Sequence, residues 1–310
     1  MTFGRFVVAA LAATSVASAA FAQSTWTGAG DGTTWTSPAN WQGGVPGAGD
    51  NVIINSGTPT LAVPASINGL TVTGGTLTLN AGLTINGAAN FATINTIVGT
   101  GSITLSSTAA VVIAAGADRQ IDVSLINGGM IELMNGSVLA INGTLTQLAG
   151  GSIQTHVDGV ALSQIGRIAT AGTATLSGTV RAVYDNGFTP EDCIFTYTVL
   201  TSQLVVPEPG LTLVAPVTLP ISASIHRRAT SLRLDPHNLA DVAGLGGSVG
   251  SDGAVTADDL IVYLDRFFAQ DLSVADVSQL GGTAGADGLL TADDIIVFLS
   301  AFVSGTCSGA

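Results

Sequence analysis

Apolar and polar residues alternate in short runs from about Val52 to Val183. In stretches such as LTVTGGTLTLNAGLTING, β-branched and apolar residues occupy every second position, and Gly-rich turns separate the runs. A period of two residues is that of a strand with one buried face. The pattern therefore predicts a mainly β protein built from many short strands.

The spacing of the turns indicates how these strands are connected. An Ile-Asn-Gly sequence recurs with its Asn at Asn68, Asn86, Asn127 and Asn142, which suggests coils of similar but unequal length. Such coils favour a parallel β-helix or a related β-solenoid, in which each coil buries its apolar residues against its neighbours. An antiparallel sandwich is the alternative, because Asn-Gly is also a strong hairpin signal.

The three tryptophans of the chain, Trp26, Trp35 and Trp41, lie close together before these strands. We predict that they form a small core that caps one end of the strand stack, because a buried Trp contributes a large apolar area. The alternative is a row of exposed rings that binds carbohydrate. The segment from Thr25 to Ile54, which ends in NWQGGVPGAGDNVII, resembles a stretch that opens many secreted bacterial β-solenoid proteins, where it forms a cap.

Proline becomes frequent between Leu176 and Asp235, although the pattern there is still that of strands. Pro is confined to edge strands and irregular parts of a sheet, so we predict that this segment caps the other end of the stack, with a linker around Pro236. The segment also contains a basic group, His226-Arg227-Arg228. We favour an exposed strand end for this group over a binding site for anions or acidic glycans.

The last part of the chain contains one motif twice. The segments from Asp241 to Phe267 and from Asp276 to Phe302 align without a gap, and each ends in an amphipathic helix pattern. The apolar helix positions are Leu260, Tyr263, Leu264, Phe267 and Phe268 in the first unit and Ile295, Phe298, Leu299, Phe302 and Val303 in the second. Two such faces can bury each other around a pseudo-twofold axis, so we predict a paired module.

Each unit also contains an Asp-Gly pair followed by Thr-Ala-Asp-Asp. This spacing fits the end of a calcium loop, in which Gly allows a sharp turn, a backbone carbonyl faces the ion and a terminal carboxylate binds it through both oxygens. The predicted calcium ligands are Asp241, Asp252, the carbonyl of Ala254, Asp259, Asp276, Asp287, the carbonyl of Leu289 and Asp294. The alternative is a helical pair without metal, in which Asp and Thr act only as helix caps.

From Leu239 to Gly305 these residues resemble the dockerin family, and more closely the dockerin-like domains at the C-terminus of some secreted bacterial proteins, through DVAGLGG and DGLLTADDIIVFL. The resemblance implies calcium-binding loop-helix units that dock onto a cohesin-like partner in an extracellular assembly. The loops after Asp241 and Asp276 are longer than an ordinary dockerin loop. A carbonyl or a water is therefore expected at the third ligand position.

Charge is scarce and unevenly placed along the chain. The net charge is −13, the basic residues are eight Arg, and ten Asp lie at or after Asp241 together with Arg266 alone. No basic cluster is large enough to neutralise a phosphate backbone, so we predict no nucleic-acid partner. The local acidity fits the two predicted calcium loops.

Residues 1–22 have the pattern of a secretory signal, with Arg5, an apolar run and small residues before Gln23. A membrane anchor is the alternative, but this run and every later one are shorter than the about 20 residues that span a bilayer. We expect a secreted or cell-surface protein without a transmembrane span. Cys193 and Cys307 allow either a disulfide or a free thiol or attachment point at Cys307.

The β region offers no evident catalytic group. Its acidic residues, Asp118, Asp122, Glu132 and Asp158, are thinly spread, and His156 has no nucleophile or ligand set near it in the sequence. We therefore predict a non-catalytic protein. Converging carboxylates and Arg on one face would instead favour a polysaccharide-degrading enzyme, whereas a Thr-rich outer face would favour the non-catalytic hypothesis.

These inferences divide the chain into three parts. They are a signal peptide at 1–22, a β-solenoid with caps at 23–235 and a calcium-binding dockerin-like domain at 236–310. The predicted function is display or anchoring in an extracellular assembly, with polysaccharide handling as its possible setting. The alternatives are a polysaccharide-degrading β-helix enzyme carried by the dockerin and a carbohydrate-binding module that uses the Trp cluster.

Overall fold

Parallel strands dominate the computed structural model of the protein, which describes residues 22–91, 97–188, 197–215, 221–244, 246–250, 254–284 and 287–304. The strands of this part of the chain form four larger sheets, here called A to D, and two small hairpins. The mainly β class with helices toward the C-terminus is confirmed. An antiparallel sandwich is excluded for these residues, because the strands of sheets A, B and C pair in parallel apart from β1 with β2.

The strands of each sheet lie in a regular order. Sheet A contains β2 (Trp41–Gln42), β1 (Gln23–Trp26), β3 (Asn51–Ile54), β6 (Gly69–Val72), β9 (Ala88–Phe91), β12 (Ala110–Ile113), β15 (Met130–Leu133), β18 (Ser152–Val157), β21 (Thr179–Tyr184) and β24 (Thr212–Val214). Sheet B contains β4 (Thr60–Leu61), β7 (Leu77–Leu79) and β10 (Ile97–Gly99). Sheet C contains β5 (Ala65–Ile67), β8 (Leu83–Ile85), β11 (Ser102–Leu105), β14 (Ser124–Asn127), β17 (Leu145–Gln147), β20 (Thr173–Leu176) and β23 (Leu204–Pro207). Sheet D contains β13 (Asp118–Ile121), β16 (Val138–Ile141), β19 (Arg167–Thr170), β22 (Tyr197–Thr201), β26 (Ser231–Asn238) and β25 (Ile221–Arg227).

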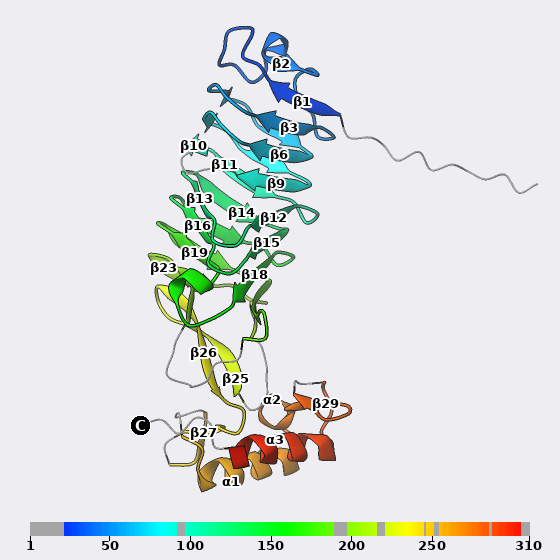
Figure 1. Ribbon diagram of the computed structural model, residues 1–310, viewed down its shortest axis with the longest axis vertical. Helices are drawn as coiled ribbons and strands as arrows, with labels where there is room; N and C mark the ends of the chain where they lie inside the picture. The colour runs from blue at the N-terminus through cyan, green and yellow to red at the C-terminus, as the bar shows by residue number, and fades with distance from the viewer. Residues whose placement is uncertain are drawn as a thin grey trace, which may run out of the picture.

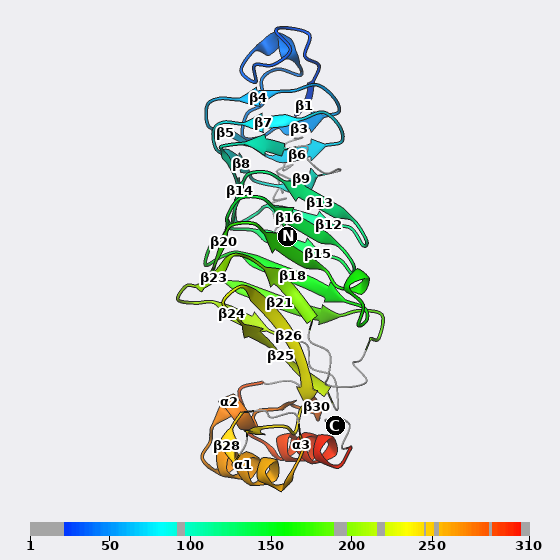
Figure 2. The same ribbon diagram turned by 90° about the vertical axis from the view of Figure 1, so that its left-hand side faces the viewer.

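The chain visits these sheets in turn. From β3 onward it passes from sheet A to sheet B or D, then to sheet C, and returns to sheet A beside the strand it left, so that Val52 pairs with Leu70 and Leu70 with Ala89. Successive passes follow one another along the long axis of the molecule (Figures 1 and 2). Alternate residues point inward, where the apolar side chains of all four sheets form one continuous core.

The Ile-Asn-Gly sequences occupy different positions in these passes. Asn68 donates to Asn51 Oδ1 over 2.8 Å, and Asn86 donates to Ser66 Oγ over 3.0 Å, as expected for ladders at corners. Asn127, in contrast, is fully buried at the end of β14, where its amide bonds the Ser152 carbonyl. A buried polar side chain needs hydrogen-bond partners. Asn127 therefore forms its hydrogen bond inside the stack and does not belong to a ladder on its surface.

The Trp-rich segment caps the stack as predicted. Trp26, Trp35 and Trp41 are at most 6 % exposed and belong to the core. Trp41 contacts both other rings edge to face, and its indole N–H donates to the Trp35 carbonyl. The fully buried Asn40, in a short 3-10 helix η1 (Pro38–Asn40), ties the surrounding loop together. The carbohydrate-binding hypothesis needs these three rings exposed in a row, and their burial contradicts it.

The other end of the stack leads directly into the helical part. Strand β26 runs antiparallel to both β22 and β25 and continues through Asn238, so the predicted linker around Pro236 is the end of a strand. The fully buried Asn238 donates to the carbonyl of Ala301 in the last helix. Figures 1 and 2 show the helical part below this hairpin, at one end of the long axis.

The helical part contains three helices and two small hairpins. The helices are α1 (Ala257–Phe268), α2 (Leu272–Ala275) and α3 (Ala292–Ser304). The hairpins are β27 (Ala243–Gly244) with β28 (Ser248–Val249), and β29 (Ser278–Gln279) with β30 (Thr283–Ala284). Each unit of the sequence repeat therefore forms one hairpin followed by one long helix.

Candidate functional site

The same carboxylate closes each unit of the repeat. Asp259 lies in the first turn of α1, fully buried. Its Oδ1 accepts from the backbone N–H groups of Val242 and Ala243 over 2.8 and 2.7 Å. Its Oδ2 accepts from the N–H and the hydroxyl of Thr256 over 2.7 and 3.2 Å. Asp259 therefore joins the start of its unit to the N-terminus of its helix.

Asp294 repeats this arrangement in the second unit. Its Oδ1 accepts from Val277 and Ser278 over 2.9 and 2.8 Å, and its Oδ2 accepts from the N–H and hydroxyl of Thr291 over 2.7 and 3.2 Å. Burial is the largest single influence on this carboxyl and raises its pKa, but the hydrogen bonds together hold the pKa below its ordinary value. The structure thus favours the ionised form of Asp294.

These bonds bear on the predicted calcium ligands. A carboxylate offers about four lone-pair positions, and Asp259 and Asp294 each accept four hydrogen bonds from the chain. In this arrangement the oxygens of both carboxylates serve as helix caps and loop anchors, and their predicted role as bidentate calcium ligands stays a prediction. The predicted caps Thr256 and Thr291 lie beside them.

Asp276 and Asp287 fit a metal loop better. The Asp276 carboxylate accepts from the backbone N–H groups of Asp287 and Gly288 over 3.0 and 2.7 Å. The Asp287 carboxylate accepts from Leu280 and Leu289 over 2.9 and 3.0 Å. Each carboxylate accepts two of about four possible bonds, so the two neighbouring groups retain oxygen lone pairs of the kind that Ca²⁺ binds.

The first loop is described only in part. Asp241 is almost fully buried, and Ala254 is half-buried, whereas Asp252 lies outside the described residues. Within the described part of the chain, no three His, Cys, Asp or Glu side chains gather closely enough to hold a metal ion. Calcium binding by the two loops stays a prediction.

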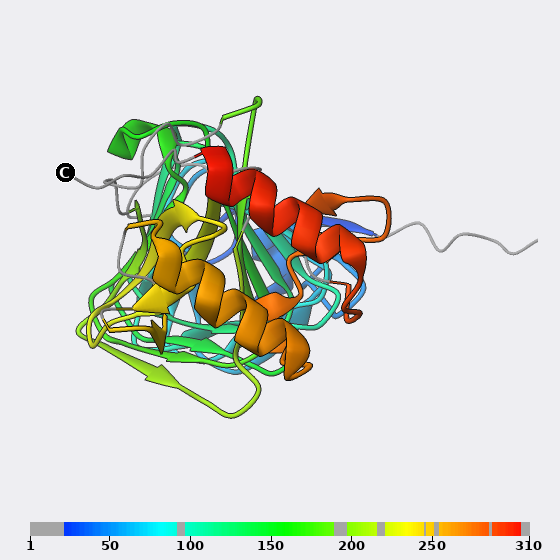
Figure 3. The same cartoon turned by 90° about the horizontal axis from the view of Figure 1, so that it is seen from below.

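Aromatic rings hold the two units together. The ring of Tyr263 in α1 stacks on that of Phe298 in α3, with centroids 3.7 Å apart and planes at 11°. Burial, with the nearby charges of Asp294 and Asp276, raises the pKa of the Tyr263 hydroxyl. Since the rings occupy equivalent positions of the repeat and the helices run in opposite directions (Figure 3), the units pair as the sequence predicts.

The predicted apolar faces of the helices are divided between the core and the surface. Phe267 and Phe302 pack against the core, but Phe268 is 76 % exposed and Val303 82 % exposed. The prediction that these last two residues face the partner helix is wrong, and so is the same prediction for Leu299, which is 40 % exposed. Successive helix residues are rotated by about 100°, so the residue after Phe267 or Phe302 points away from the helix pair.

Several large apolar residues of α1 and α3 are exposed, and we call them together the helix face. Its members are Ile261 and Phe268 of α1 and Ile296, Leu299 and Val303 of α3. Ile261 and Ile296 are equivalent in the repeat, as are Phe268 and Val303. Asp258 and Asp265 lie one helical turn from Ile261, so acidic groups flank the apolar ones.

A polar cluster on the β stack was not predicted. His156 of β18 is 8 % exposed, and its Nδ1 lies 2.8 Å from an Asp185 oxygen while its Nε2 lies 3.0 Å from Glu132 Oε1. Gln154 also donates to Glu132. Glu132, His156 and Asp185 lie on three successive passes of the chain, so only the strand register brings them together.

This cluster has the geometry of an ion-pair network. Both ring nitrogens of His156 lie within hydrogen-bond distance of carboxylate oxygens, and Nε2 also lies 3.0 Å from the amide nitrogen of Gln154. The cluster therefore links neighbouring strands of sheet A, from β15 to the end of β21.

The outer face of sheet C carries no charge over five strands. Its outward positions in β8, β11, β14, β17 and β20 are Thr84, Ser102, Thr104, Ser124, Ile126, Thr146, Thr173 and Thr175. All are half-buried between their neighbours. The outer face of sheet C is therefore uncharged, whereas the His156 cluster lies on sheet A.

Comparison with known proteins adds nothing to this description. No protein-family model, curated protein or solved structure matches the chain. Among the described residues, no helix has the length and apolar character needed to cross a membrane. The predicted signal at 1–22, apart from Ala22, and both Cys193 and Cys307 lie outside the described residues.

Proposed function

We propose that the chain is a non-catalytic secreted or cell-surface protein in which a β-solenoid body is displayed through a dockerin-like docking module. The successive passes through sheets A, B or D, and C support the β-solenoid. The repeated hairpin-helix units support the module. Secretion rests on the signal pattern of residues 1–22.

The helix face is the observation that carries the docking function. Five large apolar side chains stand exposed on two adjacent helices, at positions that include two equivalent pairs of the repeat. Exposed apolar surface of this kind marks interaction sites. The occupant we propose is an extracellular protein of the cohesin-like class, with an apolar patch for the helix face and basic groups for the ten Asp of this module.

Calcium is the proposed cofactor of the two loops. The proposed ligands are Asp276, Asp287 and the carbonyl of Leu289 in the second loop, with Asp241, Asp252 and the carbonyl of Ala254 as their counterparts in the first; the free lone pairs of Asp276 and Asp287 support the two carboxylates of this set. A bound ion would offset the clustered negative charge. Asp259 and Asp294 hold loop and helix together whether or not an ion is present.

Chemical cross-linking to cells that secrete the protein tests the docking function. We expect the full chain to form one defined cross-linked product with a surface protein, and the double variant Ile261→Asp with Ile296→Asp to lose it. Val112→Asp is the matched control, since Val112 is also exposed, on sheet A. Equal cross-linking of all three proteins would contradict docking through the helix face.

The enzyme alternative is best tested at the His156 cluster. This is a place where two carboxylates converge on a basic side chain, near Arg181 on the same sheet. Release of reducing ends from polygalacturonate, abolished by His156→Ala while the fold persists, would support an enzyme. The proposed function predicts no release from the unaltered protein.

A further inference from the structure

The β25–β26 hairpin gathers arginines at the lower end of the stack. Arg227 ends β25, Arg228 follows it, and Arg233 lies on β26. All three side chains are exposed. Arg167 belongs to β19 of the same sheet, separated from β26 only by β22. We call these four residues the Arg patch.

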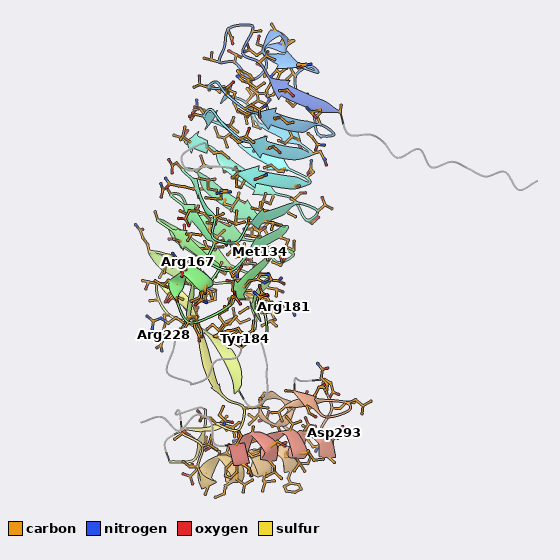
Figure 4. The ribbon with its side chains drawn as sticks, in the orientation of Figure 1. Met134, Arg167, Arg181, Tyr184, Arg228 and Asp293 are labelled. Atoms are coloured by element: carbon orange, nitrogen blue, oxygen red, sulfur yellow. The ribbon has the colours of Figure 1, made fainter. Side chains whose placement is uncertain are left out.

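The strand register places Arg167 and Arg233 on one face, whereas Arg227 pairs with the buried Leu232 and is exposed because it ends its strand. Ile168 and Leu232, the neighbours of Arg167 and Arg233, are buried in the core, so alternation directs both arginines outward. Figure 4 shows Arg167 and Arg228 on the same side of the stack, above the helical part. Neighbouring strands lie about 4.8 Å apart, so Arg167 and Arg233 are two strand spacings apart and Arg227 lies one spacing further.

The patch is not neutralised by the described residues. Among the side chains that the structure describes, no carboxylate forms a salt bridge with any of its four arginines, whereas Arg266 of α1 pairs with Asp265 and Asp271. Arg167 donates to the Leu162 carbonyl over 2.6 Å, which orients its guanidinium. Uncompensated arginines stand out in a chain with a net charge of −13.

We propose that the Arg patch binds an acidic polysaccharide through its carboxylate or sulfate groups. The planar guanidinium matches both groups with paired N–H donors. A polymer with regularly spaced anions can reach arginines on separate strands at once, which gains affinity over a single anion. The surrounding negative charge of the protein restricts the attraction to this face. The site lies on the β stack and does not depend on docking through the helices.

Affinity electrophoresis of the full chain tests this site. The gels contain polygalacturonate for carboxylate, dextran sulfate for sulfate, or neutral dextran as the uncharged reference. We expect retardation by one or both acidic polymers and none by neutral dextran. The triple variant Arg227→Gln, Arg228→Gln and Arg233→Gln should bind about tenfold more weakly or worse, while Arg181→Gln, an exposed arginine of sheet A, should bind as the unaltered chain does.

Circular dichroism of each variant shows whether the fold persists, and single Arg→Gln variants replace the triple one if it does not. Retardation by the two acidic polymers distinguishes carboxylate from sulfate as the preferred group. No retardation by either polymer, or an equal loss in Arg181→Gln, would overturn the proposal. Equally tight binding of a short DNA duplex would overturn it too, since it would show unselective attraction to polyanions.

Discussion

At the scale of single residues, Asp259 and Asp294 determine the shape of the helical part. Each ionised side chain accepts four hydrogen bonds that join the first residues of a unit to the start of its helix. The sequence predicts the two local bonds of each Asp, those from the Thr three residues before it in the T-x-x-D cap. It does not predict the bonds to Val242 or Val277, because nothing local specifies where the loop returns.

Asp294→Asn should destabilise the helical part. The amide nitrogen of Asn would face N–H donors, leaving buried groups unsatisfied at a cost of about 2–4 kcal/mol. Denaturant unfolding followed by the helical dichroism signal measures this loss. The matched control is Asp293→Asn, the preceding and partly exposed residue, where we expect a change below about 1 kcal/mol. Equal effects of the two changes would show that the four bonds are not decisive.

Acid should destabilise the helical part. The pKa of Asp294 is lowered in the folded chain, so its contribution to stability is complete above the ordinary carboxyl pKa of about 4 and is lost as the pH falls through the lower, folded value. Thermal unfolding monitored at 222 nm between neutral pH and pH 2.5 measures this. A melting temperature of the helical part that does not change on acidification would contradict the inference.

At the scale of elements, packing decides which predicted apolar positions are core and which are surface. The repeat and its helix periodicity predict the pairing of α1 with α3. The stacked rings of Tyr263 and Phe298 form this contact. Periodicity could not show that Phe268 and Val303 lie outside that contact, because the apolar positions of one helix do not indicate how far the second helix extends along it. The extension of β26 through the expected linker likewise depends on pairing with β25, a long-range contact.

Truncation of two phenylalanines of these helices should have unequal effects on the free energy of unfolding. Phe298→Ala removes a fully buried ring that stacks on Tyr263, and we expect a loss of about 3–5 kcal/mol in unfolding free energy. Phe268→Ala removes a ring that is 76 % exposed, and we expect a change within about 0.5 kcal/mol. Comparable losses in equilibrium denaturation would mean that Phe268 is packed in solution, and the helix face would be smaller than described.

At the scale of the whole molecule, the described residues form a long β stack with the helical part at its end. Periodicity and turn spacing predict the strands, and the parallel pairing and Trp cap agree with them. The His156 cluster could not be predicted, since the passes that bring Glu132 and Asp185 to it differ in length. The sequence singles out Arg227 and Arg228 but favours an exposed strand end for them, and Arg167 and Arg233 become their neighbours only through sheet D.

Calcium titration of the full chain by calorimetry tests the account most directly. We predict saturable binding of one ion per loop, lost from the second loop in the variant Asp276→Asn with Asp287→Asn and retained in Asp265→Asn, an exposed residue of α1. Asp259 and Asp294 are left intact, because their removal would unfold the units for reasons unrelated to metal. No saturable heat, with the same helical signal in calcium and in chelator, would contradict the calcium-binding docking module and leave the repeated Asp as caps alone.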